Sequence, residues 1–169
     1  HYENSGVPLM VLGSELGVRR DLRQGYLLAV SYGVLAARYL SDDSFGAVFS
    51  FRKNPEFRSV ANVPVHRAVV KGIAPIFGRS LSLASRITLE SGRYDRLERR
   101  TEVAQGRSSG VALWDLVLTG KVSDVGIDWA VGLYNAFDYR YSLPTSDEFP
   151  MRTVPQSGRS FLLSLDVTL

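Results

Sequence analysis

The feature that most constrains how this chain can fold is the alternation of side chains at its C-terminal end. Over residues 161–169 every second side chain is apolar, from Phe161 to Leu169, and mainly polar side chains stand between them. Successive side chains of a β-strand point to opposite faces, so this segment predicts a strand with one apolar and one polar face.

The same period of two recurs along most of the chain. It is clearest over residues 81–91, where Leu83, Ile87 and Leu89 alternate with polar side chains, and an α-helix would not keep this period. Pro75 predicts that the segment around it bulges or ends there. Further strands are expected over residues 11–20, 26–39, 65–76, 111–120 and 127–139, with an eighth candidate at 45–52.

The links between these segments alternate in length. Short links at 21–25, 77–80 and 121–124 alternate with longer polar links at 41–62, 94–109 and 143–157. Short turns at one rim and long loops at the other are typical of bacterial outer-membrane barrels, as are aromatic residues near the strand ends. The pattern therefore predicts an all-β fold, an antiparallel transmembrane β-barrel segment of about seven or eight up-and-down strands.

In such a barrel the apolar faces contact lipid and the polar faces line the interior. Six charged residues at polar positions are therefore candidates for facing the lumen: Arg67, Lys71, Arg86, Glu90, Asp115 and Asp128. Ligand contacts are expected in the long links, because long loops carry recognition on rigid scaffolds.

Composition argues against several other classes of protein. No run of about 18 apolar residues is present, so no membrane-spanning helix is expected. The net charge is only +3 and its cations are scattered, which argues against nucleic-acid binding, while the absence of cysteine removes disulfides and thiolate sites. His66 is expected to be structural or to line the lumen, so neither a metal site nor a cofactor is predicted.

One stretch matches a catalytic pattern. Residues 106–110 read Gly-Arg-Ser-Ser-Gly, the G-x-S-x-G pattern of hydrolases. That motif needs a strand before it and a helix after it, whereas here a polar segment precedes it and a predicted strand follows. A flexible loop is the preferred interpretation, and no catalytic residue is predicted.

The C-terminal third carries a family resemblance. Residues 131–141 combine an expected strand with a short Asn-Ala-Phe-Asp motif, and a proline-containing link then leads through Gly-Arg into the final alternating strand. This order resembles the end of the β-barrel of TonB-dependent outer-membrane receptors. The residues that carry the resemblance are Asn135, Phe137, Asp138, Gly158, Arg159, Phe161 and, at the terminus, Leu169.

The sequence departs from the family pattern at two positions. Ala136 stands where the family usually has leucine, and Leu169 stands where its closing strand usually ends in an aromatic residue. The residues themselves also allow a structural reading. Asn135 and Asp138 are expected to satisfy backbone donors where the strand meets the outer loop, because these side chains bond readily to nearby backbone.

The resemblance implies that residues 1–169 are the C-terminal part of a receptor barrel of roughly 22 strands, without its plug domain. Such receptors lie in the outer membrane of Gram-negative bacteria and import a scarce nutrient, commonly an iron–siderophore chelate or cobalamin. The implied partners are outer-membrane lipid, a small-molecule ligand such as a metal chelate, the barrel assembly machinery, and TonB acting through the missing plug. The start at His1, with no initiator Met or leader, also favours a fragment.

Two alternatives stay open. A self-contained barrel of about eight strands, with a structural or adhesion role, has the same alternation. A soluble lipocalin-like barrel would instead turn Leu83, Trp114, Leu133 and Leu165 into a closed, dry centre. Bacterial single-chain barrels have even strand numbers. Each unpaired backbone group at a strand edge in hydrocarbon costs several kcal/mol. Seven strands therefore require either an eighth strand or a place in a larger barrel.

Overall fold

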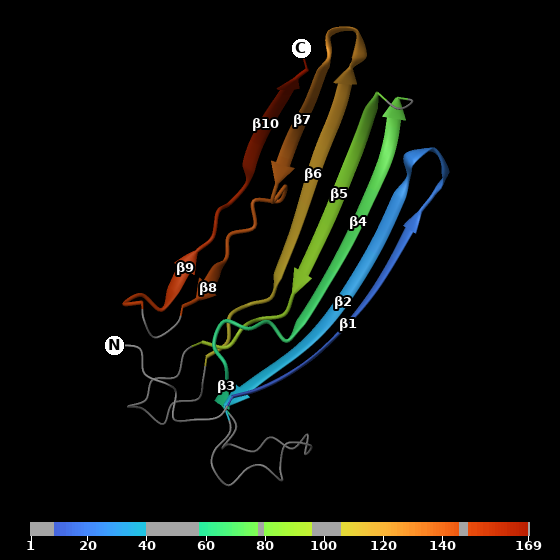
Figure 1. Cartoon of the computed structure of the whole chain (residues 1–169). Helices are drawn as coiled ribbons and strands as arrows, with labels where there is room; N and C mark the ends of the chain where they lie inside the picture. Colours follow the sequence, from blue (N-terminus) through green and yellow to red (C-terminus); the bar gives the residue numbers. More distant parts are fainter. Residues whose placement is uncertain (1–8, 40–57, 78–79, 96–105, 146–148, 169) are drawn as a thin grey trace.

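The protein forms one curved antiparallel sheet with a small separate hairpin (Figure 1). The structure is a computed structural model that describes residues 9–39, 58–77, 80–95, 106–145 and 149–168. Seven long strands pair in chain order: β1 (Leu9–Asp21), β2 (Leu27–Tyr39), β4 (His66–Phe77), β5 (Leu81–Glu90), β6 (Val111–Val122), β7 (Ile127–Tyr134) and β10 (Ser160–Val167). The short β3 (Arg58–Ser59) pairs with the end of β2, and β8 (Ser142–Pro144) pairs with β9 (Thr153–Pro155).

The all-β, antiparallel prediction is confirmed. Six of the seven expected strands begin and end within two residues of their predicted limits, and the bulge expected near Pro75 occurs between Pro75 and Phe77. The expected strand at 127–139 is wrong at its end, because the chain turns at Asn135 and Asp138, whose φ angles are +50° and +53°. The hairpin of β8 and β9 was not predicted, and the candidate strand at 45–52 lies outside the described residues.

Two short turns lie at one end of the sheet, and the described parts of the longer connections lie at the other (Figure 1). The 3-10 turns η1 (Arg23–Gly25) and η3 (Ser123–Val125) close the β1–β2 and β6–β7 hairpins. The second turn falls two residues later than expected, because β6 stays paired with β7 through Val122 and Gly126 supplies the left-handed residue, with φ at +64°. None of the helical segments in the described ranges has the length and apolar character needed to cross a bilayer.

The strand register sorts side chains into two faces. Directly opposed residues share a face, so the pairs Lys71–Arg86 and Arg86–Asp115 place three charged residues together, while Trp114 is paired with Ile87 on the other face. Three hollows over the described sheet are lined mainly by residues of the polar face.

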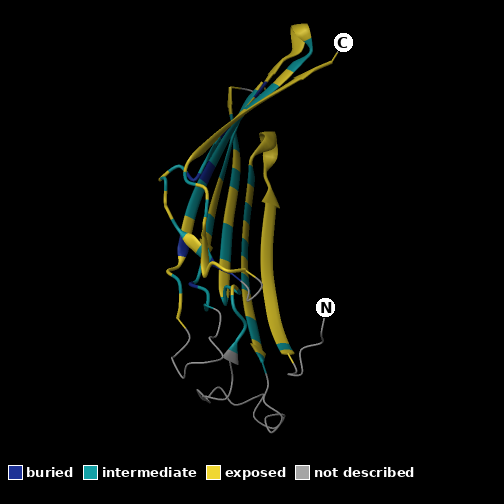
Figure 2. Cartoon of the chain, turned by 90° about the vertical axis from the view of Figure 1, so that its left-hand side faces the viewer, coloured by how far each residue is buried: buried dark blue, intermediate teal, exposed yellow. Residues whose placement is uncertain are grey.

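The apolar face remains uncovered. Figure 2 shows a single layer of strands in which exposed and half-buried residues predominate. Apart from Pro144, the only apolar side chain that is buried in the described ranges is Val111, at 7% exposure. Leu83, Trp114, Leu133 and Leu165 lie on this face rather than in a dry centre, and Leu165 is 64% exposed.

The sheet is open in the described part of the chain. β1 and β10 each pair with a single neighbour there, so neither edge has its second partner. β2 pairs directly with β4 from Leu27 to Val34, so the sheet has no place between these two strands for a further one.

Candidate functional site

The polar face brings together five of the six charged residues singled out from the sequence. Around one hollow of about 270 Å³ lie Arg67, Lys71, Arg86, Glu90 and Asp115, carried by three neighbouring strands. The sixth, Asp128, is on the same face of β7 but nearer the short turns, where its carboxylate lies 3.2 Å from Lys121 Nζ. The hollow is also lined by Tyr141 and Leu143, which belong to the segment around β8.

Asp115 ties three strands together from a nearly buried position. Its side chain is 10% exposed, and Arg86 donates to Oδ2 through Nη2 at 2.7 Å and Nε at 3.0 Å. Its other oxygen, Oδ1, accepts the backbone N–H of Asn135 at 2.9 Å, just past the end of β7. A charge-assisted bond of this kind is roughly twice as strong as a neutral one, so Asp115 fixes the β5–β6–β7 register at this level.

Glu90 is shared between two guanidinium groups. Arg67 Nε lies 3.3 Å from Oε1, and Arg93 Nη2 donates to Oε2. Arg93 also donates to Asn62 Oδ1 at 2.9 Å, so it links the end of β5 to the connection before β4. Arg93 could not be singled out from the sequence, because it follows the strand and no alternation marks it.

The Asn-Ala-Phe-Asp motif forms a tight turn that we call the clasp, residues 135–138 together with Gly158 and Arg159. Asn135 uses both ends of its amide: Nδ2 donates to the Tyr139 carbonyl and Oδ1 accepts the Tyr139 N–H, each at 2.9 Å. The Ala136 N–H donates to the Trp114 carbonyl at 2.8 Å, which continues the pairing to β6. Asn135 thus satisfies backbone groups locally, as the sequence predicts.

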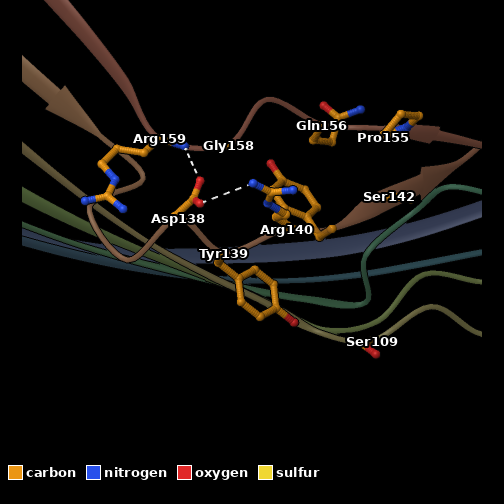
Figure 3. A pocket seen from close by; sticks show the side chains of 10 residues that line it. Ser109, Asp138, Tyr139, Arg140, Ser142, Pro155, Gln156, Gly158 and Arg159 are labelled. Atoms are coloured by element: carbon orange, nitrogen blue, oxygen red, sulfur yellow. Dashed lines mark hydrogen bonds and ion pairs between the residues drawn. The ribbon is translucent and has the colours of Figure 1, made fainter.

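The second half of the clasp joins the end of β7 to the start of β10 (Figure 3). The carboxylate of Asp138 accepts the Arg159 N–H at 2.8 Å, while Arg140 Nη2 lies 3.7 Å from its other oxygen. Gly158 lets that carboxylate approach, since a Cβ at this position would collide with Asp138 Oδ1. The contacts with Asp138 therefore explain the Gly-Arg pair at this position without a ligand.

The aromatic members of the motif lie at the loop end of the apolar face. Phe137 and Phe161 are each 74% exposed. The ring of Phe137 packs against that of Trp114, with 5.3 Å between the two ring centroids. Trp114 in turn donates its indole N–H to Ser85 Oγ at 2.9 Å. The last residue of the motif, Leu169, lies outside the described residues.

His66 lies on the apolar face, where its Nδ1 is 2.8 Å from the Tyr32 hydroxyl. Of the two roles expected for it, this placement fits the structural one and not a place on the polar face. Within the described ranges no group of three His, Asp or Glu side chains could hold a metal ion. Residues 106–110 run directly into β6, so they lack the helix that a hydrolase elbow requires.

The sequence matches no protein-family model and no curated protein. The family resemblance therefore rests on the motif residues and on the pattern of strands and links that surrounds them.

The clasp predicts a pH effect. The Arg159 backbone N–H, helped by the nearby Arg140 and Arg159 charges, holds the pKa of Asp138 below its usual value. A carboxylate with a depressed folded-state pKa stabilises the fold above its unfolded value of about 3.9 and loses this contribution as the pH falls further. Asp138→Asn should therefore flatten the fall in unfolding free energy between about pH 5 and pH 3, measured by urea titration. An equal fall in unfolding free energy in the Asp138→Asn variant and in the unchanged protein would contradict this prediction.

Proposed function

We propose that this chain is part of the wall of a transmembrane β-barrel in a bacterial outer membrane, namely the C-terminal arc of a TonB-dependent receptor. The observation that carries the proposal is a single sheet with one apolar, uncovered face and an opposite face that is charged and hydrogen-bonded. This is the side-chain arrangement of a barrel with lipid outside and water inside.

The apolar face is too extensive for a water-soluble sheet of one layer. Large apolar side chains that are at least 40% exposed occur on this face from one edge of the sheet to the other: Leu12, Leu16, Val18, Leu28, Val30, Tyr32, Ile87, Leu89, Val131, Phe161, Leu163, Leu165 and Val167. Soluble monomers rarely leave a continuous patch of this extent in water, so it requires a cover. Lipid supplies that cover along the whole face at once.

The lining of the hollows disfavours the lipocalin-like alternative. A barrel that binds an apolar ligand inside turns its apolar side chains inward, whereas here the hollow over β4, β5 and β6 is lined by charged residues that include Arg67, Arg86 and Asp115. The self-contained eight-stranded alternative needs one long strand more than the seven in the described part of this sheet, and the direct pairing of β2 with β4 leaves no place for it between them. A larger barrel instead supplies partners for β1 and β10.

On this proposal the chain contributes wall and ligand-facing surface to active uptake of a scarce nutrient such as an iron–siderophore chelate or a cobalamin-like ligand. Lipid contacts the outer face, the ligand enters past the long connections, and TonB acts through a plug region supplied elsewhere in the receptor. The clasp supports the receptor assignment, because its Asn135, Asp138 and Gly158 are motif residues with a defined structural task at the barrel's closing hairpin.

The membrane topology can be tested with single-cysteine variants, because the chain contains no cysteine. Leu163 and Ser164 are adjacent on β10 and lie on opposite faces. A fluorophore at Leu163→Cys should be quenched by nitroxide-labelled lipid in vesicles, and the same fluorophore at Ser164→Cys should be quenched much less. The pair Leu16→Cys and Glu15→Cys on β1 should repeat this contrast.

Equal quenching at both members of each pair, or stronger quenching on the polar face, would contradict a lipid-facing apolar surface. The receptor role itself is tested by nutrient uptake in cells whose full-length receptor lacks residues of the long connections. Unchanged uptake of every chelate offered would count against it.

A further inference from the structure

Two cations stand directly opposite one another on the polar face. Lys71 of β4 and Arg86 of β5 are cross-strand partners, so their Cβ atoms lie about 5 Å apart. Like charges in this position destabilise a sheet unless something compensates for them. Arg86 has Asp115, but Lys71 makes no ion pair with any described residue.

The charge around this pair is positive overall. The hollow of about 270 Å³ is lined by four cations, Arg67, Lys71, Arg86 and Arg93, against two carboxylates, Glu90 and Asp115. Glu90 is already shared by two arginines, and Asp115 is occupied by Arg86 and the Asn135 N–H. Neither carboxylate is therefore free to neutralise Lys71.

The same cations are open to a second, larger hollow. Arg67 and Lys71 also line a hollow of about 660 Å³ over β1, β2 and β4. Their partners on β2 are Gly33 and Ala29, which are too small to cover them. The carboxylate in this hollow, Glu15, lies on β1 beyond Gly33, so it is a full strand away from Arg67.

We propose that the polar face carries an anion-binding site in which Lys71 and Arg86 hold carboxylate or phosphate oxygens and Arg67 lies beside them. A ligand there relieves the repulsion between the two opposed cations, and guanidinium groups match the geometry of such oxygens. The inference deepens the proposed function, on which it rests for an interior open to water. An anion-binding site restricts the expected transported ligands to those of net negative charge and excludes neutral or cationic ones.

The test uses the full-length protein in detergent micelles with defined probes. Citrate and pyrophosphate represent the carboxylate and phosphate sources, and triethyl citrate is the neutral ester of the same skeleton. Calorimetry should show binding of at least one anion and none of the ester. Lys71→Gln should weaken anion binding about tenfold, the loss of roughly 1.4 kcal/mol, whereas Lys71→Arg should stay within about threefold of the unchanged protein.

The matched control is Lys121→Gln, a lysine on the same face that is paired with Asp128 and lies nearer the short turns. It should leave anion binding unchanged. Without anion, Lys71→Gln should melt no lower than the unchanged protein, because it removes the like-charge pair; this separates lost binding from lost fold. Unchanged binding in Lys71→Gln, equal losses in both glutamine variants, or binding of the ester as tight as that of citrate would overturn the site.

Failure of this site and failure of the membrane proposal give different results. Lipid quenching that distinguishes Leu163 from Ser164, together with no Lys71-dependent binding, would overturn the anion site and leave the barrel wall. Lys71-dependent binding without the quenching contrast would support the site and overturn the membrane assignment.

Discussion

Replacing Leu163 with arginine is expected to lower the free energy of unfolding from lipid vesicles by about 2–4 kcal/mol. Leu163 lies in the middle of β10 on the apolar face, opposite Val131, and is largely exposed. If lipid covers this face, the guanidinium must lie in hydrocarbon. A charged side chain on the lipid face of a barrel destabilises it most near the midplane of the bilayer. Urea titration followed by the fluorescence of the two tryptophans measures the change.

Ser164→Arg is the control for this prediction, because it adds the same side chain one residue away on the polar face. Asp166 lies two residues further along that face, so the added cation meets an acidic neighbour. The change should stay within about 0.5 kcal/mol, as for a solvated surface position. A loss at Ser164 as large as that at Leu163 would mean that the apolar face is not the one in contact with lipid.

The strands could be predicted from the sequence because alternation is a local property. Over residues 81–90, the odd or even position of a residue already indicates the face of the sheet on which its side chain lies. The same rule applied to the other strands places the six charged candidates on one face, as expected. The end of β7 could not be predicted in the same way. It depends on the left-handed turn at Asn135 and on bonds to the Trp114 carbonyl and to Arg159, which are distant in sequence.

The connections within the candidate site depend on register, which the sequence does not fix. Arg86 and Asp115 are separated by 29 residues, and a shift of one residue between β5 and β6 would carry Asp115 to the other face. The role of Arg93 could not be predicted because it lies beyond the alternating segment. The strands β8 and β9 could not be predicted because three residues carry too little pattern. The opposition of Lys71 and Arg86 likewise appears only once the pairing of β4 with β5 is known.

Asp115→Ala is expected to lower the free energy of unfolding by about 2–3 kcal/mol. The substitution leaves the Asn135 N–H without its acceptor in a buried position, and it leaves Arg86 without its carboxylate. The value lies below that for a fully buried ion pair because the Arg86 side chain is 49% exposed, so water compensates part of its loss. Asp115→Asn keeps an oxygen for the Asn135 N–H and should lose about half as much.

The matched control is Asp128→Ala on the neighbouring strand, which removes a carboxylate of the same polar face from an ion pair with Lys121. That side chain is 50% exposed, and exposed pairs contribute about 0–1 kcal/mol, so its loss should be small. Urea titration of the three variants in the same vesicles gives the comparison. If Asp115→Ala lost no more than Asp128→Ala, the bonds of Asp115 to Arg86 and Asn135 would not fix the closing strands, and the clasp would have to be held by Asn135 and Asp138 alone.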